Sequence, residues 1–483
     1  SWWKNCSSWS ERSSRIIFRF EMFKKLNLYI FLLFFLITVS ASNDEKNSLI
    51  EIYDNPNDIN LINIVIKDNI DIGGKVTSAG SLALKDNIAK SDAFIIDKLK
   101  RANYYILGKA NLSEWANFRS EDSVSGWSSL GGQTKHYLDD TYNPCGSSSG
   151  SAVAVSMGIV DIAIGTETNG SISCPSSVNG IVGMKPTTGL VSRSGIVPIS
   201  SSQDTAGPMG ATVDIVAKTL EVISGYDEND PATSFIPSNF DFNFSSATKN
   251  NSLKGVRLGL LDSKNANPQV VELHLKIKEI VNSLGGELIL INDDRDYPGD
   301  AEYYVLLYEF RVGLEEYLKD ANSSMKKLTD IIDFNNANKD NVMPYFGQDI
   351  FYKSIESTSY LKFLWSKYKI YKSYQSTKGL MDKYDLDAFI GLTRGPAWKI
   401  NYDGGDYIAM NDSPQFGSGG YAAHNGMPHI TIPYFEINKF PVGISIIGDR
   451  WNDKLIIGYA SAIEKSRYNL YSQWYKDLIW KKF

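Results

Sequence analysis

The sequence has few of the residue types that most often bind metals or form disulfide frameworks. Its 483 residues include four histidines and three cysteines, with neither an H-E-x-x-H pair nor a C-x-x-C pair. We therefore expect no metal site and no disulfide framework. Cys145 and Cys174 flank a serine-rich segment and could form a bridge, but two buried free thiols are the expectation we favour.

A strong charge of either sign is also missing. Lysine and arginine number 49 against 55 aspartate and glutamate, a net charge of −6, and there is no long basic run. Nucleic acid is therefore not an expected partner. With 43% hydrophobic residues, the chain can build a large core in one big domain or in two smaller ones.

The amino-terminal part contains an apolar run that is typical of a targeting segment. Residues 22–41 begin with Met22 and two lysines, continue with apolar residues and end in small residues, as in a secretory signal peptide cleaved after Ala41. An uncleaved membrane anchor is the alternative, because the run is close to the minimum length for spanning a bilayer. The mature protein is thus expected to be secreted or extracytoplasmic, or tethered to a membrane by residues 26–41. Residues 1–21 are either foreign to the native protein or a genuine upstream extension.

Two turns rich in glycine and serine, residues 146–151 and 165–171, dominate the middle of the chain. Glycine allows the backbone to approach a ligand closely, and successive N–H groups in such turns can bind an anion. Two turns of this kind, fixed relative to each other, are typical of a nucleophile beside an oxyanion hole.

Strands and helices alternate around these turns, which predicts an α/β architecture with a largely buried sheet. Amphipathic stretches within residues 245–390 predict helices that cover one side of the molecule. The expected strands are residues 61–67, 104–107, 161–164, 429–433 and 442–447, and the expected helices are residues 91–102, 111–118, 151–157, 270–284, 352–374 and 453–465.

Two other motifs could account for the first turn. Residues 146–150 fit G-x-S-x-G with Ser148 as nucleophile, but a turn-like segment with Pro144 precedes them where a nucleophile elbow needs a strand. His424 or His429 would have to be assumed as the base. A phosphate-binding G-x-x-x-x-G-K-[ST] motif is absent, and the turns could also be ordinary loops.

Residues 146–151 (GSSSGS), 165–172 (GTETNGSI) and 183–187 (GMKPT) resemble, in order and spacing, the signature of the amidase signature family. The similarity extends to IKDNI (residues 66–70), TSAGS (77–81), GKANL (108–112) and PVG (441–443). Residues 127–151, 189–209 and 395–398 are most similar to the peptide amidase branch. The resemblance implies one domain over residues 42–483, with a mixed, twisted central sheet covered by helices on both faces and a variable helical covering region at 245–390.

The family resemblance implies a Ser–cis-Ser–Lys triad. The nucleophile corresponds to Ser171, the bridging serine to Ser147 after a cis peptide bond, and the base to Lys67. Lys67 matches better than Lys85 of the second KDNI segment, because only Lys67 follows an apolar strand and precedes TSAGS. The lysine must be uncharged to accept a proton, so we expect it to be buried and Asp68 to point away from it.

The peptide N–H groups of the second turn correspond to the family's oxyanion hole, and they belong to Thr168, Asn169, Gly170 and Ser171. Many members have Asp, Gly and Arg where this chain has Glu167, Asn169 and Ser173. These departures affect the shape of the pocket and any arginine contact there, whereas the backbone donors remain.

The resemblance implies an amidase without a cofactor that cleaves carboxylic C–N bonds through an acyl-enzyme. Small or peptide-terminal primary amides are the expected substrates. A fatty-acid-amide hydrolase, the glutaminase component of a tRNA-dependent amidotransferase, and a catalytically silent binding protein of the same fold are the alternatives. No feature of the sequence indicates an oligomeric state, and membrane contact is expected only if residues 26–41 are uncleaved.

Overall fold

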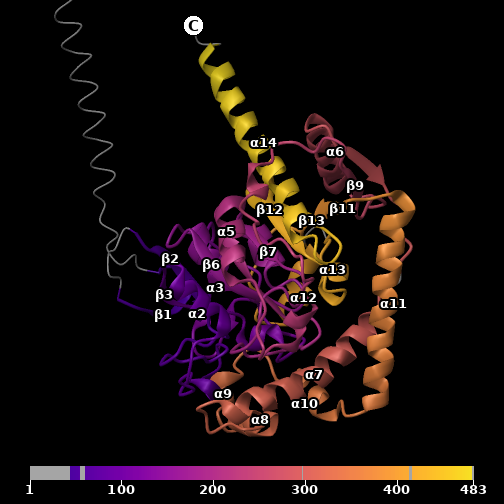
Figure 1. Ribbon diagram of the computed structural model, residues 1–483. Helices are drawn as coiled ribbons and strands as arrows, with labels where there is room; N and C mark the ends of the chain where they lie inside the picture. Colours follow the sequence, from indigo (N-terminus) through magenta and orange to yellow (C-terminus); the bar gives the residue numbers. More distant parts are fainter. Residues whose placement is uncertain (1–43, 55–59, 296, 413–415, 481–483) are drawn as a thin grey trace, which may run out of the picture. The chain divides into compact units, whose positions relative to one another are not determined.

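The computed structural model describes residues 44–54, 60–295, 297–412 and 416–480, with side chains up to Arg467 in the last helix. The chain divides into two units, Ser1–Asp44 and Glu45–Phe483, and the second contains all the elements below (Figure 1). The predictions for residues 1–21 and 22–41 lie outside the described residues. Within the described part, no helix combines the length and apolarity needed to cross a membrane.

A mixed eleven-stranded sheet forms the centre of the described unit, in the order β1-β3-β2-β6-β8-β7-β12-β13-β11-β9-β10. Strand β2 runs parallel to both β3 and β6, whereas β6, β8, β7, β12, β13 and β11 pair antiparallel in succession. The predicted α/β fold with a mixed central sheet is confirmed. The strands are β1 (Leu49–Ile52), β2 (Ile62–Lys67), β3 (Tyr104–Ala110), β6 (Ile162–Glu167), β7 (Val182–Lys185), β8 (Thr205–Gly210), β9 (Arg257–Leu260), β10 (Glu287–Leu290), β11 (Ala388–Leu392), β12 (His429–Ile437) and β13 (Phe440–Ile447), with a separate pair β4 (Trp127–Ser128) and β5 (Gly132–Gln133).

Helices cover both faces of the sheet, as the family resemblance implies. The helices are α2 (Phe94–Arg101), α3 (Ser149–Ser156), α4 (Ser173–Val178), α5 (Val213–Ile223), α6 (Pro268–Ser283), α7 (Gly299–Asp320), α8 (Leu328–Ala337), α9 (Lys339–Val342), α10 (Asp349–Glu356), α11 (Tyr360–Tyr384), α12 (Gly405–Ala409), α13 (Gly420–His424) and α14 (Asp453–Trp480). Short 3-10 turns lie at Leu82–Leu84, Glu114–Asn117, Pro231–Phe235, Ala247–Lys249 and Met410–Asp412.

The alternation of side chains along the strands explains how both faces are filled. Ile64 and Ile66 of β2 pack in the large cluster with α2, α5, α6 and α14, whereas Val65 between them packs with α3 on the opposite face. The side chains of all three residues are fully buried, so this part of β2 is covered on both faces of the sheet. A strand segment buried on both faces reads as a continuous apolar run, as residues 64–66 (IVI) of β2 do.

Three expected elements differ in the structure. The helix expected at residues 352–374 is broken into α10 and α11, because the side chain of Ser359 caps a new helix by accepting from the Lys362 N–H. The helix expected at 111–118 is only a 3-10 turn, Glu114–Asn117, with left-handed φ values inside it. Within the covering region, β9 and β10 extend the main sheet, so residues 245–390 are not purely helical.

Candidate active site

Lys67 is the last residue of β2, and its side chain meets the start of both glycine-serine turns. Its Nζ donates to Ser147 Oγ at 2.8 Å, Ser148 Oγ at 3.0 Å and Thr166 Oγ1 at 2.8 Å, and it lies 3.2 Å from the Thr166 carbonyl oxygen. Strand β2 pairs in parallel with β6, so both strands deliver their carboxyl ends to the same edge of the sheet. This strand order brings a lysine and a serine 80 residues apart in sequence into contact.

Burial sets the charge state of this lysine. The side chain of Lys67 has no solvent exposure, and desolvation lowers its pKa from 10.5 to about 7, although the charges of Asp204 and Glu167 act in the opposite direction. The neighbouring Asp68 is engaged elsewhere, in an ion pair with Lys109 at 2.9 Å and in a hydrogen bond from Ser78. A neutral amine is therefore well populated at neutral pH, as a proton acceptor requires.

The main chain joins the two turns directly. The Ser148 N–H donates to the Ser171 carbonyl oxygen at 3.1 Å, and the Gly146–Ser147 peptide bond is cis. Ser171 is nearly buried, with 8% of its surface exposed, and among the described contacts none ends on its hydroxyl. The structure thus brings Lys67 and Ser147 into hydrogen-bond contact and places the Ser171 backbone beside them.

The second turn is held from three sides. Glu167 accepts from the N–H groups of Ile172 at 2.8 Å and Ser173 at 2.9 Å, which fixes the chain just beyond Ser171. Thr168 donates its hydroxyl to Asp204 at 2.6 Å. These hydrogen bonds fix the conformation of the turn and therefore the directions of its own N–H groups.

The third attachment comes from helix α7 and was missed by the sequence reasoning. The buried carboxylate of Glu302 accepts from Asn169 Nδ2 at 2.8 Å, from Gln203 Nε2 at 3.0 Å and from the Tyr297 hydroxyl. Gln203 in turn lies 3.3 Å from the Thr168 carbonyl oxygen. Asn169, which departs from the common family residue, therefore connects the second turn to helix α7 of the covering region.

The alternative with Ser148 as an elbow nucleophile finds no support in the geometry. Ser148 is fully buried, and its hydroxyl lies between Lys67 Nζ and the Thr166 main chain. The two histidines that could act as its base form hydrogen bonds with other serines. His424 Nε2 lies 2.8 Å from Ser373 Oγ, and His429 Nε2 lies 2.6 Å from Ser445 Oγ. Burial lowers the pKa of both histidines to about 4.

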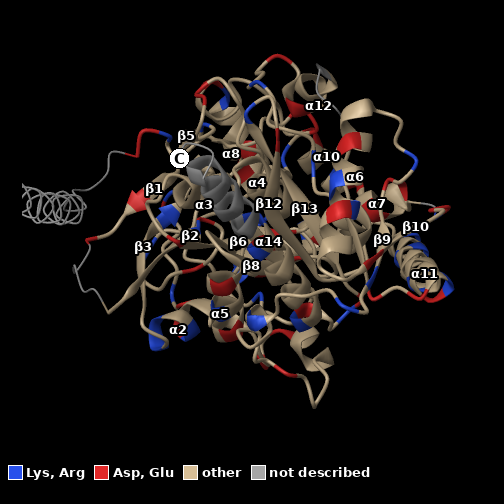
Figure 2. Cartoon of the chain, turned by 90° about the horizontal axis from the view of Figure 1, so that it is seen from above, with Lys and Arg blue, Asp and Glu red and all other residues tan. Residues whose placement is uncertain are grey.

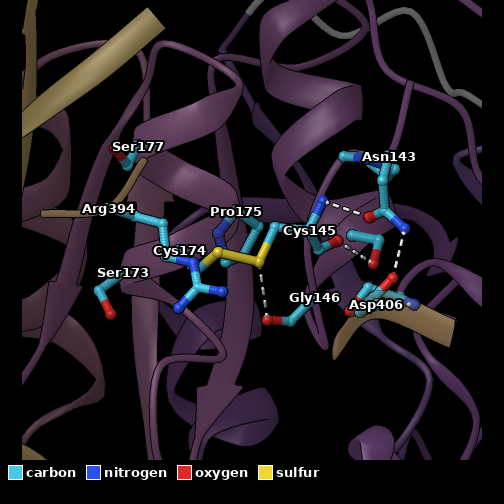
Figure 3. Close-up of a disulfide and its surroundings, with 12 residues drawn as sticks. Asn143, Cys145, Gly146, Ser173, Cys174, Pro175, Ser177, Arg394 and Asp406 are labelled. Atoms are coloured by element: carbon cyan, nitrogen blue, oxygen red, sulfur yellow. Dashed lines mark hydrogen bonds between the residues drawn. A yellow bond between two sulfur atoms is a disulfide. The ribbon is translucent and has the colours of Figure 1, made fainter. Parts of the chain in front are cut away.

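A disulfide joins Cys145 and Cys174, so the expectation of two free thiols is wrong (Figure 3). Cys145 directly precedes the first turn and Cys174 follows the second. Because the two turns are in contact, the Cα atoms of the cysteines lie only 6.1 Å apart. Both cysteines are buried against Val178, Trp398 and Phe440. The bond links the residue two positions before Ser147 to the residue three positions after Ser171, and spacing along the chain gave no sign of this proximity.

The described unit contains two further cavities of interest, and the first of them reaches the second turn. One of about 320 Å³ is lined by Thr166 and Thr168 together with Arg193, Asp204 and Tyr317. The other, of about 530 Å³, is lined by Arg295, Arg394, Phe416, Gly417, Ser418 and Tyr421. Within the described ranges, no group of three or more His, Cys, Asp or Glu side chains is placed to hold a metal ion.

The family model for amidases matches residues 48–457, which include both turns, Lys67 and the disulfide. The chain belongs to the amidase signature family. It is an amidase, a hydrolase of carboxylic C–N amide bonds.

Relatives and solved structures agree with this assignment. A protein of Schizosaccharomyces pombe named as an amidase is 32% identical over 83% of this chain and 73% of its own length. The native peptide amidase of Stenotrophomonas maltophilia is similar with a TM-score of 0.81, at 35% identity over 90% of this chain and 91% of that one, and a peptide amidase bound to the competitive inhibitor chymostatin gives the same score and identity. A glutamyl-tRNA(Gln) amidotransferase component of Methanospirillum hungatei is 30% identical over 84% of this chain and 93% of its own.

Proposed function

We propose that this amidase hydrolyses peptide-terminal or small primary amides through Lys67, Ser147 and Ser171. The observation that carries the proposal is the 2.8 Å hydrogen bond from a fully buried lysine amine to the serine that follows the cis peptide bond. A lysine with a pKa of about 7 can take up a proton at neutral pH, and a serine hydroxyl needs such a base to become a nucleophile.

In the proposed reaction, Ser171 Oγ attacks the amide carbonyl carbon while its proton passes to Ser147. Ser147 simultaneously gives its own proton to the neutral Lys67. The carbonyl oxygen becomes an oxyanion facing the main-chain N–H groups of residues 168–171, each of which contributes about 10²–10³-fold in rate. Return of the proton to the departing nitrogen releases ammonia or an amine and leaves an ester on Ser171.

Water completes the proposed cycle. Lys67, neutral again after releasing its proton to the leaving group, accepts a proton from water through Ser147. The resulting hydroxide adds to the acyl carbon, and collapse of the second tetrahedral intermediate returns the proton to Ser171. The products are the free acid and the starting enzyme, with no cofactor consumed.

The substrate class rests on likeness to the peptide amidases. Their structures resemble this chain more closely, at a TM-score of 0.81, than the glutamyl-tRNA(Gln) amidotransferase component of Thermotoga maritima does at 0.69. Glutamine hydrolysis in a tRNA-dependent amidotransferase remains the second candidate because relatives of that name cover the same length of chain. A fatty-acid-amide hydrolase and a silent binding protein are the further alternatives.

The decisive experiment compares Ser171→Ala with Ser151→Ala. Ser151 is a buried serine of α3 whose hydroxyl only donates to the Ile164 carbonyl oxygen. We expect Ser171→Ala to lose turnover of a peptide amide by about 10³-fold or more and to lose labelling by a fluorophosphonate, while Ser151→Ala keeps both.

The choice of substrate class follows from the same assay. Peptide amides, glutamine and fatty acid amides are compared for the parent enzyme, with inhibition by chymostatin as a second readout. Preferred turnover of glutamine or of a fatty acid amide would replace the proposed substrate. No turnover of any amide and no labelling would favour the silent binding protein.

We also propose that the protein is made through a secretory route. A buried disulfide forms and persists in oxidising compartments, and the sequence of residues 22–41 has the features of a signal peptide. Mass spectrometry of the protein from its own host should give Ser42 as the first residue. A first residue upstream of Leu26 would indicate a retained anchor instead.

A further inference from the structure

Helix α11 presents an unusual distribution of side chains. Half of its buried positions carry hydroxyl residues, Ser366, Ser373 and Thr377, and the large apolar ones there are Ile370, Leu380 and Met381. Its exposed side carries a stripe of large apolar and aromatic residues at helical spacing, which we call the α11 stripe: Leu361 (80% exposed), Leu364 (45%), Trp365 (58%), Tyr368 (48%) and Tyr371 (54%). A surface helix normally has the reverse arrangement, with the apolar side turned to the core.

Hydrogen bonds on the buried side explain how the helix stays attached without using the stripe. Ser373 bonds to His424 at 2.8 Å, and Thr377 accepts from Arg295 and Asn425, each at 3.1 Å. Phe363, on the side toward α7, stacks on Tyr308 at 4.4 Å between ring centroids. The stripe is therefore not needed to hold α11 in the fold, and it remains available to a partner.

The charge around the stripe is strongly positive. Residues 360–384 contain six lysines and a single acidic residue, Asp382, in a chain whose net charge is −6. Lys362, Lys369 and Lys372 are exposed, and none of them forms an ion pair with a described carboxylate. Figure 2 shows α11 at the periphery of the described unit, with lysine positions in blue on its turns.

We propose that the α11 stripe docks on the surface of an anionic lipid bilayer. Tryptophan and tyrosine rings favour the boundary between headgroups and acyl chains, and lysines beside them attract acidic headgroups. A second copy of the same helix would bring two lysine-rich surfaces together, so the charge disfavours self-association through this side. The helix lies along the membrane in this arrangement and does not cross it, and the contact is independent of residues 26–41.

A probe placed within the stripe tests this directly. In a full-length Cys6→Ser protein, Cys145 and Cys174 are bonded to each other, so Tyr368→Cys supplies one free thiol for an environment-sensitive fluorophore. Phe235→Cys in the same background is the matched control, because Phe235 is an aromatic residue with 76% exposure outside α11. The probes are compared on vesicles of phosphatidylcholine alone and of phosphatidylcholine mixed with phosphatidylserine.

We expect a several-fold rise and a blue shift in fluorescence for the probe at position 368 on the anionic vesicles, with little change at position 235. Exchanging Lys362, Lys369 and Lys372 together for glutamine should weaken this binding about 100-fold, since each lysine near an acidic bilayer contributes about 1 kcal/mol. Circular dichroism and amide hydrolysis should stay unchanged in these variants, because the exchanged residues are exposed.

Three results would overturn the proposal. Equal responses at positions 368 and 235 would mean attachment through another part of the chain, such as residues 26–41. The absence of any response at 368 would mean that the stripe does not enter the bilayer. A response that follows protein concentration without vesicles would assign the stripe to contacts between copies of the chain.

Discussion

Replacing Lys67 by methionine should abolish activity and, at the same time, change how the stability of the protein depends on pH. Burial lowers the pKa of Lys67 from 10.5 to about 7, so an unfolded chain binds a proton there that the folded chain releases between these two values. Where the unfolded state binds more protons, the free energy of unfolding rises with pH. Below pH 7 the folded protein bears the full penalty of a charged, buried lysine, about 5 kcal/mol.

The measurable part of this penalty lies between pH 7 and pH 9. Over that interval the free energy of unfolding of the parent should increase by about 2 kcal/mol more than that of Lys67→Met, because methionine has no proton to exchange. The hydrogen bonds that methionine loses to Ser147 and Thr166 change the absolute stability at every pH and cancel in this comparison. Urea denaturation followed by tryptophan fluorescence at both pH values gives the two differences.

Lys85→Met is the matched control for this experiment. Lys85 occupies the same place in the second KDNI segment, but it is exposed to solvent. Its replacement should leave the pH dependence of the parent intact. If Lys67→Met and the parent show parallel stability curves from pH 7 to pH 9, the amine is not held neutral by burial and the proposed base is wrong.

Three further predictions concern the proposed base, the contacts of Glu302 and the disulfide. For the parent, kcat/KM should fall about tenfold for each pH unit below 7, because only neutral Lys67 accepts a proton; a flat profile down to pH 5 would exclude it as the base. Glu302→Gln should lower kcat by about tenfold with little change in melting temperature, since one of three donors loses its acceptor; an unchanged kcat would show that the turn holds its shape without α7. Replacing Cys145 and Cys174 by alanine should lower the free energy of unfolding by about 3–4 kcal/mol, because the unfolded chain regains the conformational entropy of a loop that the bond closes over 29 residues. Fluorophosphonate labelling of that variant well below its melting temperature should also slow, and an unaltered labelling rate would limit the bond to a stabilising role.

The sequence was most informative where local pattern and strand order decide the structure. The apolar run that ends in Lys67 and the glycine-serine turns at their spacing carry the family resemblance, and it was this resemblance that predicted the contact between Lys67 and Ser147. Strands such as β2 and β6 are recognisable from their short apolar runs, IVI at residues 64–66 and IAI at residues 162–164, and helix α2 follows from its amphipathic spacing.

Contacts between distant segments were not predictable in the same way. Glu302 lies 133 residues after Asn169 on a helix without a motif, so only the packing of α7 shows that it holds the second glycine-serine turn. The disulfide depends on two turns that meet in space, and residue spacing favoured free thiols. The break between α10 and α11 comes from one capping serine, Ser359, within a pattern that otherwise continues as a helix.

The bond between Cys145 and Cys174 has a practical consequence for anyone who produces this enzyme. A chain synthesised in a reducing cytoplasm reaches its folded state with both sulfurs as thiols, and its two loops are then positioned by non-covalent forces alone. Oxidation by air during purification then produces a mixture of disulfide-bonded and reduced molecules, in proportions that depend on handling. Specific activities from different expression hosts become comparable only after the thiol content of each batch has been counted.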